Sequence, residues 1–398
     1  LGICKPIVRK LFGVADSSSL SSFKCADGCK RNCEMAAAST KLPTYTIRKL
    51  NSPISSGRSL SAIEYNLLGH FIAIPAILSK QIESNIVSCV ALLFLMKMRI
   101  DSRPSLLRDN ISPYDSLIKA LQKYWGSAFG EEGKSLKVHI SLTHAVNDLI
   151  EFGSAALLSA SPFESENRLL KGGRTMTRQR KTLHERYLSL QNIFDLLNER
   201  YVEEGSPKAK LERAMRKLQH LDSNEAIDVK QMRKQEMKVS SEIDVDDDDL
   251  RRISECLNFA NYELWGKAIM GMRRFSSLSC QWEKWNDTSR IVVTHQGAFR
   301  FVEIMAIARS GTNVKFVTRA CRTESAFTSL LNRMDKRAYS DLVDALSYVE
   351  SLNLIVLWAG FEREFIAIEP SKIVDHYCKV EFGGKTFLIQ IPRSVSHV

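Results

Sequence analysis

The sequence predicts a mainly α-helical protein with a helical N-terminal domain, central long coiled-coil-like helices, and an α+β C-terminal region with a small β-meander. Three observations predict this class. Apolar residues recur at three- and four-residue steps after residue 60, a stripe of period 3.5 crosses the middle, and alternating apolar residues between glycines appear near the end. The 398 residues, 44% of them hydrophobic, suffice for one large core or for two or three domains.

The first segment contains three cysteines at even spacing, Cys25, Cys29 and Cys33. They would share one face of a helix, but Gly28 weakens that helix, and a structural zinc site needs a fourth ligand. The first histidine is His70, far along the chain. We therefore predict no metal site here. Because the chain starts with Leu and Met35 precedes three alanines, we interpret residues 1–34 as translated leader or a disordered extension.

Residues 35–60 are polar and contain two prolines, which predicts an extended arm. Residues 61–160 predict a helical domain in which Pro75 kinks or ends one helix. Further helices are expected at 82–98, 115–125 and 142–158. The longest apolar run, 86–96, has about half of the roughly 20 residues that cross a bilayer. It predicts a buried helix and no membrane contact.

Residues 161–182 predict a basic linker. Six basic residues, no acid and a Gly-Gly pair lie between residues 168 and 181. Glycine disfavours a stable helix, so the segment reads as an exposed loop. Two interpretations remain open, a solvated linker and a loop that contacts phosphates.

Residues 183–265 carry the clearest periodic signal. Counting by four and three from Leu183 to Leu264, 18 of the 24 positions reached are apolar, against 14 of the other 58 residues. A stripe of period 3.5 is buried only against another helix, which is the coiled-coil condition. The Gly205-Ser206-Pro207 sequence interrupts the helix, so we expect two or three long helices. They serve either self-association or bundle packing within one chain.

Residues 242–249 carry six acids directly before Arg251 and Arg252. Acids placed before a helix stabilise its positive end, which is the favoured interpretation. The alternative is an acidic segment that imitates phosphates and shields a basic groove. In the C-terminal region, 266–398, we expect helical structure at 326–346 and strands on either side of Ala359-Gly360 and of Gly383-Gly384.

The composition favours an anionic partner and shows no catalytic motif. Lys and Arg number 56 against 45 acids, a formal net charge of +11, which favours nucleic acid or another polyanion. Residues 128–135, AFGEEGKS, fit a loose phosphate-loop pattern with Lys134, but a helix precedes them and two glutamates oppose a phosphate. The dispersed histidines and cysteines indicate no catalytic or metal-ligating group, and we predict no cofactor.

Basic residues near aromatic ones are the candidate contacts with nucleic acid, because cations neutralise phosphates and aromatic rings stack on unpaired bases. The predicted RNA-binding residues are Arg168, Lys171, Arg174, Arg178, Arg180, Lys181, Lys208, Lys210, Arg213, Arg216, Lys217, Lys267, Arg273 and Arg274.

The layout resembles that of the coat or nucleocapsid-like protein encoded by the first reading frame of plant amalgaviruses. The resemblance covers most of residues 35–398 and rests on length from Met35, helical pattern, central heptads, basic balance and lack of a catalytic motif. In that family the polymerase is reached by ribosomal frameshifting at a sequence that reads Phe-Arg, and Phe299-Arg300 suits such a place. A plant rhabdovirus-type nucleoprotein is a neighbouring resemblance. No functional residue is carried over.

From these observations we expect a non-enzymatic viral protein of the host cytoplasm that binds RNA without sequence preference and associates with itself. The resemblance implies the viral genome as the RNA and a viral polymerase joined by frameshift fusion. Two alternatives remain, a coiled-coil interaction scaffold without nucleic acid and an NTPase that uses Lys134.

Overall fold

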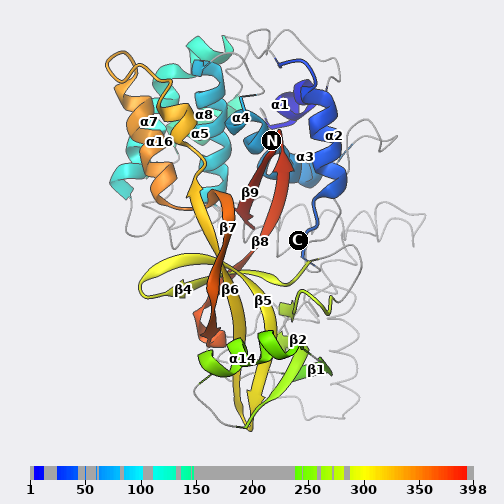
Figure 1. Ribbon diagram of the computed structural model, residues 1–398. Coiled ribbons are helices and arrows are strands. Elements are labelled where there is room, and N and C mark those ends of the chain that lie inside the picture. The colour runs from blue at the N-terminus through cyan, green and yellow to red at the C-terminus, as the bar shows by residue number, and fades with distance from the viewer. Residues whose placement is uncertain are drawn as a thin grey trace, which may run out of the picture. The chain divides into compact units, whose positions relative to one another are not determined.

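The computed structural model describes residues 4–12, 25–43, 50, 60, 62–80, 85–101, 111–130, 136–144, 146–147, 238–243, 245–257, 261–270, 273–281 and 287–391. Of these residues, 45% are helical and 34% lie in strands. A nine-stranded sheet occupies the C-terminal region (Figure 1). The prediction of a mainly α protein is therefore wrong, because the expected small meander is one part of a much larger sheet.

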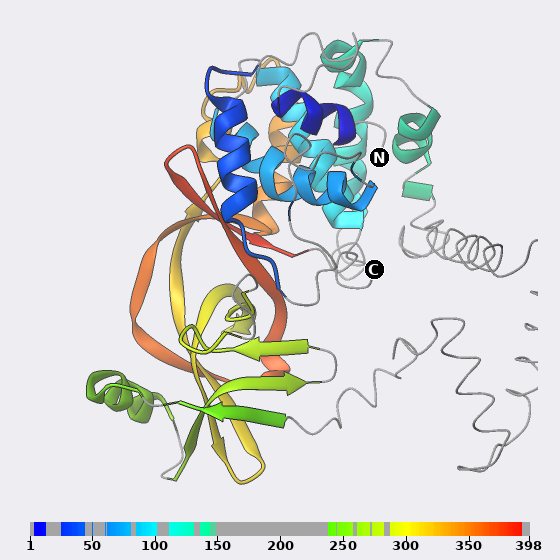
Figure 2. The same cartoon turned by 90° about the vertical axis from the view of Figure 1, so that its right-hand side faces the viewer.

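The helices of the N-terminal half gather with α16 at one end of the sheet, as Figures 1 and 2 show from two sides. They are α1 (Cys4–Leu11), α2 (Cys29–Ser39), α3 (Ala62–Leu68), the π-helical turn η2 (Gly69–Ala73), α4 (Ile74–Leu78), α5 (Asn85–Asp101), α7 (Ile111–Phe129) and α8 (Leu136–Thr143). Helices α15 (Thr328–Leu331) and α16 (Ser340–Ser351) come from the C-terminal half.

Two predicted helices are confirmed, 82–98 as α5 and 115–125 within α7. Helix α5 is apolar on every side, and its residues from Val87 to Met96 are buried because other elements surround it. Pro75 does not end its helix. The chain passes through a π-helical turn in which the Ile74 N–H donates to the Gly69 carbonyl five residues back, which accommodates the proline. Most of the predicted helix at 142–158 lies outside the described residues.

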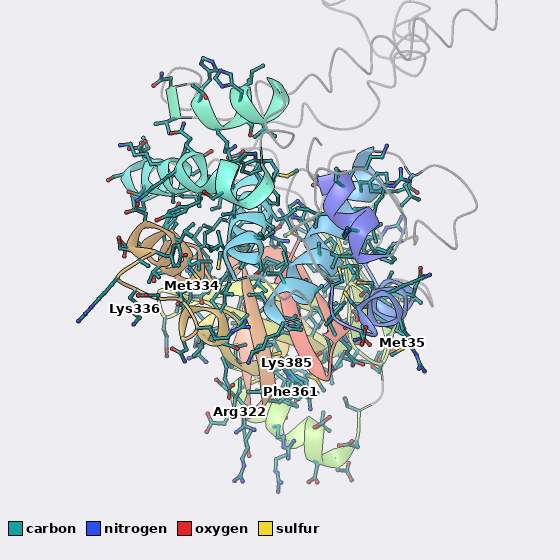
Figure 3. All side chains as sticks on the ribbon, turned by 90° about the horizontal axis from the view of Figure 1, so that it is seen from above. Met35, Arg322, Met334, Lys336, Phe361 and Lys385 are labelled. Atoms are coloured by element: carbon teal, nitrogen blue, oxygen red, sulfur yellow. The ribbon has the colours of Figure 1, made fainter. Side chains whose placement is uncertain are left out.

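The N-terminal segment belongs to the fold. Helix α1 buries Ile7, Val8 and Leu11, and Phe12 directly after it is fully buried. Helix α2 begins at Cys29, so Met35 lies inside it, with its side chain 57% exposed and pointing away from the core (Figure 3). The interpretation of residues 1–34 as standing outside the fold is wrong for residues 4–12 and 25–34. Their apolar side chains are too few to form a core alone, and they pack against helices distant in sequence.

The three cysteines of this segment are packing residues. Cys29 and Cys33 are buried in the main core, and the Cys29 thiol lies within hydrogen-bond reach of those of Cys25 and Cys33. The hydrogen bonds with Cys25 and Cys33 act in opposite directions, and with burial added they raise the pKa of Cys29 to about 12. Such a thiol stays protonated at neutral pH and is therefore a weak nucleophile.

All pairings in the sheet are antiparallel. The strands are β1 (Lys238–Glu242), β2 (Glu263–Met270), β3 (Arg273–Ser276), β4 (Arg290–His295), β5 (Ala298–Ser310), β6 (Asn313–Ser325), β7 (Ile355–Ile368), β8 (Ile373–Phe382) and β9 (Lys385–Gln390). Their order is β1-β2-β5-β4-β8-β9-β7-β6, and β3 pairs with β2. Because β5 also pairs with β6, six strands close into a ring, β5-β4-β8-β9-β7-β6.

Glycines shape the ring at two places. The hairpin predicted at Gly383-Gly384 is confirmed, since Phe382 pairs with Lys385 and both glycines have the positive φ that a tight two-residue turn requires. The turn expected at Ala359-Gly360 is absent. Strand β7 runs straight through this position, and its register with β6 shifts there in a bulge that Gly360, with φ of 124°, accommodates.

The coiled-coil prediction is wrong between residues 238 and 264, where β1, helix α14 (Asp247–Cys256) and the start of β2 follow one another. Residues 183–236 lie outside the described residues. The acidic run is confirmed as a helix start. Asp246 is the N-cap of α14 and accepts a 2.8 Å hydrogen bond from the Asp249 N–H, and three aspartates occupy the first turn.

The described residues belong to one compact unit that joins residues 1–157 and 237–398. Its main core unites the N-terminal helices, α16 and the β8–β9 hairpin. Polar contacts join the same elements, with buried Arg99 of α5 donating from Nη2 to the Gln390 carbonyl of β9. None of the described helices combines the length and the hydropathy that crossing a bilayer requires.

The position of Phe12 allows a test of the N-terminal segment. We expect Phe12→Ala to lower the free energy of unfolding by about 3–5 kcal/mol, because it leaves a cavity in a closed core. Met35→Ala removes an exposed side chain and should change it by less than about 0.5 kcal/mol. Urea unfolding of both variants measures the difference, and equal stabilities would show that residues 4–12 do not pack in the core.

Two buried histidines should make stability depend on pH. Burial lowers the pKa of His70 well below 6.5, and burial together with Arg273 lowers the pKa of His376 to about 3. The unfolded chain takes up both protons near pH 6.5 and the folded chain does not, so stability present above that pH is lost as pH falls toward 3. His376 should cost about 2 kcal/mol at about pH 5, and His70 adds to the loss in the same direction.

Urea unfolding at about pH 7.5 and about pH 5 measures this loss. His376→Gln should reduce the difference between the two pH values by about 2 kcal/mol. His139→Gln, at an exposed position, is the control for the substitution itself. An undiminished difference in the His376 variant would contradict the assignment.

Candidate functional site

A ladder of charged residues crosses three strands of the ring. Glu303 of β5 is the register partner of Arg290 on β4 and of Arg319 on β6. Its Oε1 lies 3.4 Å from Arg290 Nε, and its Oε2 lies 3.6 Å from Arg319 Nη2. Arg290 Nη1 also lies 2.9 Å from Asp287 Oδ2. The two arginines on neighbouring strands therefore share the carboxylate of Glu303, whose side chain is only 7% exposed.

The electrostatics of the ladder favour the charged form of Arg290. Burial alone would lower the pKa of Arg290, but Asp287 and Glu303 outweigh burial and raise it. Arg319 lies over the ring of Phe361, with its guanidinium carbon 3.7 Å from the ring centre. A cation over an aromatic face gains from the ring quadrupole. The ladder thus fixes two arginine side chains inside the ring of strands.

Beside the ladder, Cys321 and Tyr377 fill the ring interior. The Cys321 thiol lies 3.4 Å from the Tyr377 hydroxyl, and Tyr377 packs edge-on against Phe301 at 5.1 Å between ring centres. Burial raises the pKa of Cys321 to about 11 and that of Tyr377 well above its usual value. A protonated thiol is a poor nucleophile at neutral pH, so Cys321 has the properties of a packing residue.

A pocket opens where β5 and β6 separate. Their pairing starts at Val302 and Ala320, whereas residues 298–301 pair with β4 and residues 321–325 with β7. The gap between these two strand ends is a pocket of 380 Å³. Its lining residues are Phe299, Arg300, Phe301, Cys321, Arg322, Thr323, Asn353, Val356 and Glu362.

Two arginines line this pocket, and they differ in their partners. Arg300 Nη1 lies 3.3 and 3.5 Å from the two carboxylate oxygens of Glu362, so its charge is balanced. Among the described residues, no carboxylate pairs with Arg322. The Arg322 guanidinium instead lies against Gly360, its register partner on β7. Arg322 is exposed and available to an anion at the pocket.

The structure places only three of the predicted RNA-binding residues. Lys267 lies on β2, and Arg273 and Arg274 lie on β3. Lys267 pairs with Ser276, and Arg274 pairs with Ile269. Because residues two apart on a strand point to the same face, Lys267 and Arg274 lie on one face of the β2–β3 pair. Arg273 lies on the other face and donates to the Val374 carbonyl at 3.4 Å. The predicted residues from Arg168 to Lys217 lie outside the described residues.

None of these three residues lines the pocket. Strand β2 pairs with β5 at residues 307–309, near the end of β5 opposite to Phe299. Sequence reasoning missed the pocket residues, although it singled out Phe299-Arg300 for another reason. The signal was present in the strand pattern of AFRFVEIMA, where Phe299 extends the alternation beyond the buried Phe301.

Residues 128–135, which fit a loose phosphate-loop pattern, begin at the end of a helix, as the sequence predicts. Helix α7 ends at Phe129 and Gly130 follows with a positive φ, which is a helix C-terminus and not the strand end that a phosphate loop follows. Lys134 lies outside the described residues. Across the described ranges, no group of three or more His, Cys, Asp or Glu side chains is arranged to hold a metal ion.

No protein-family model, no curated protein and no solved structure matches the chain. The site is therefore interpreted from its geometry and chemistry alone.

The ladder predicts unequal effects of the same substitution at two glutamates. Glu303→Gln should lower the free energy of unfolding by about 3 kcal/mol, because it removes the charge of a buried carboxylate that pairs with two partly buried arginines. Glu362→Gln breaks an ion pair whose side chains are 34% and 40% exposed, and should cost less than about 1 kcal/mol. Thermal or urea unfolding measures both, and a similar small cost at Glu303 would show that the ladder does not hold the strands together.

Proposed function

We propose that the chain is a non-enzymatic protein that binds RNA without sequence preference, and that the pocket between β5 and β6 is one of its contacts. The observation that carries the proposal is the pairing of an uncompensated arginine with an exposed aromatic ring in one pocket. Arg322 has no carboxylate partner among the described residues, and Phe299 is 46% exposed. Guanidinium groups bind phosphate oxygens through paired N–H donors, and aromatic rings stack on bases of any kind.

The charge of the chain supports the same partner. The formal net charge is +11, and the long-range field of a basic protein attracts a polyanion. Lys267 and Arg274, which share one face of the β2–β3 pair, are a second candidate contact. Contacts of these kinds read phosphate and the aromatic face of a base, which are common to all sequences.

The viral part of the proposal comes from the resemblance in sequence layout. It makes the RNA a viral genome and the chain a coat or nucleocapsid-like protein. Self-association is proposed for the heptad residues 183–236, which lie outside the described residues. The β5–β6 pocket does not depend on either part, so RNA binding can be tested separately.

Substitution of Arg322 tests the proposal. We expect Arg322→Ala to weaken binding of a labelled RNA of about 12 nucleotides several-fold. The slope of log affinity against log salt should also become shallower by about 0.7, the value for one phosphate contact on a single strand. Fluorescence anisotropy between about 50 and about 200 mM salt measures both quantities.

Arg337→Ala is the matched control, because it also removes an exposed guanidinium, but at a position that does not line the pocket. Its neighbour Lys336 lies at the margin of the molecule in Figure 3, away from Arg322. Arg337→Ala should change the affinity by less than Arg322→Ala does. Binding that is absent at low salt, or that does not weaken as salt rises, would refute the proposed function.

A further inference from the structure

The pocket between β5 and β6 has the size of a site for a small ligand. Its 380 Å³ lie at the lower end of the range of about 300–1,000 Å³ that such sites occupy. Two strand ends that do not pair with each other form its sides. A pocket of this volume has room for one base but not for a duplex, in which the bases are stacked inside the helix.

Phe299 supplies an apolar surface on which a base can stack. Among the large hydrophobic side chains that the described residues expose, it is the one aromatic residue. The others are Met35, Ile111, Ile140 and Leu250. Phe299 lies on β5, where it pairs with Thr294 of β4, so its backbone is fixed by the sheet. Because its backbone is already ordered, stacking of a base on the ring has only two side-chain torsions to order.

Gly360 determines where the Arg322 guanidinium lies. A Cβ on Gly360 would lie 2.8 Å from Arg322 Nη2 and 3.4 Å from Nε, so any side chain there would displace the guanidinium. Because Gly360 has no side chain, the Arg322 guanidinium lies directly against the backbone of β7 at the bulge. From this place Arg322 lines the same pocket as Phe299. The two residues thus come from the two strand ends that bound the pocket, Phe299 from β5 and Arg322 from β6.

Asn353 adds a neutral hydrogen-bonding group to the pocket. Its backbone is held on both sides, since its N–H donates to the Glu350 carbonyl at 3.0 Å and its carbonyl accepts from Gln390 Nε2 at 3.4 Å. The residue has a φ of 50°, a conformation that asparagine tolerates better than most residues. Its side-chain amide offers both a donor and an acceptor, which the edge of any base can use.

We infer that this pocket seats one unpaired nucleotide, with the base on Phe299 and the phosphate on Arg322, an inference that rests on the proposed RNA binding. The protein should therefore bind single-stranded RNA in preference to double-stranded RNA. The selectivity comes from the base, because phosphates are present in both forms and only the single strand presents an unstacked base.

Substitution of Phe299 in the full chain tests the inference. Phe299→Ala should weaken binding of single-stranded RNA of about 12 nucleotides by about 5-fold to 100-fold, the loss of one stacked base. Binding of the corresponding duplex should not change. Anisotropy measures both affinities, and a 2-aminopurine in the single strand reports stacking directly through a fluorescence change that the variant should lose.

Ile140→Ala is the matched control, since its side chain is 48% exposed against 46% for Phe299. It should leave both affinities unchanged, and thermal unfolding should show all three proteins equally folded. If wild-type protein binds single strands and duplexes equally, and Phe299→Ala alters neither, the nucleotide pocket is refuted while RNA binding stands. Equal losses for both RNA forms also refute it, and no binding of either RNA by wild-type protein refutes the proposed function as well.

Discussion

The structure depends on the position of β5, which pairs with β4 along its first half and with β6 along its second. Because β5 pairs with both β4 and β6, it closes the six-stranded ring. Where its pairing changes from β4 to β6, the start of β5 and the end of β6 are not paired with each other. Glu303 lies at this change and is the shared partner of Arg290 and Arg319. One buried carboxylate thus joins three strands at the place where the hydrogen-bonded ladder between β5 and β6 stops.

The pocket is a consequence of the same geometry. The register between β6 and β7 shifts at two places in the ring, and one of these shifts lies next to the pairing of Gly360 with Arg322. Inside the ring, apolar and aromatic residues such as Phe301 and Tyr377 pack together beside the ladder. At the edge of the pocket, Phe299 and Arg322 continue the two strands outward. The apolar interior of the ring thus borders a pocket with polar and aromatic lining residues. The proposed function rests on this pocket.

The helices support the ring through the β8–β9 hairpin. Phe382, Phe387 and Ile389 of this hairpin belong to the same core as helices α2, α4 and α5. The Ser79 hydroxyl donates to the Phe382 carbonyl at 3.5 Å, and Arg99 donates to the Gln390 carbonyl. Residues near the start of the chain and residues near its end therefore complete one core. The segment containing Cys29 and Cys33 belongs to this core although its composition alone suggests an extension.

The sequence by itself determined the features that depend on neighbouring residues. Helix α5, helix α7, the Gly383-Gly384 hairpin and the N-cap at Asp246 follow from local hydropathy, turn chemistry and capping. The tertiary structure decided the rest. A spacing of four residues, as between Val239 and Ile243, places side chains on one face of a helix and on one face of a strand alike, so periodicity could not distinguish them. The pocket joins residues from β5, β6 and β7 that only ring closure brings together, and no local pattern encodes that closure.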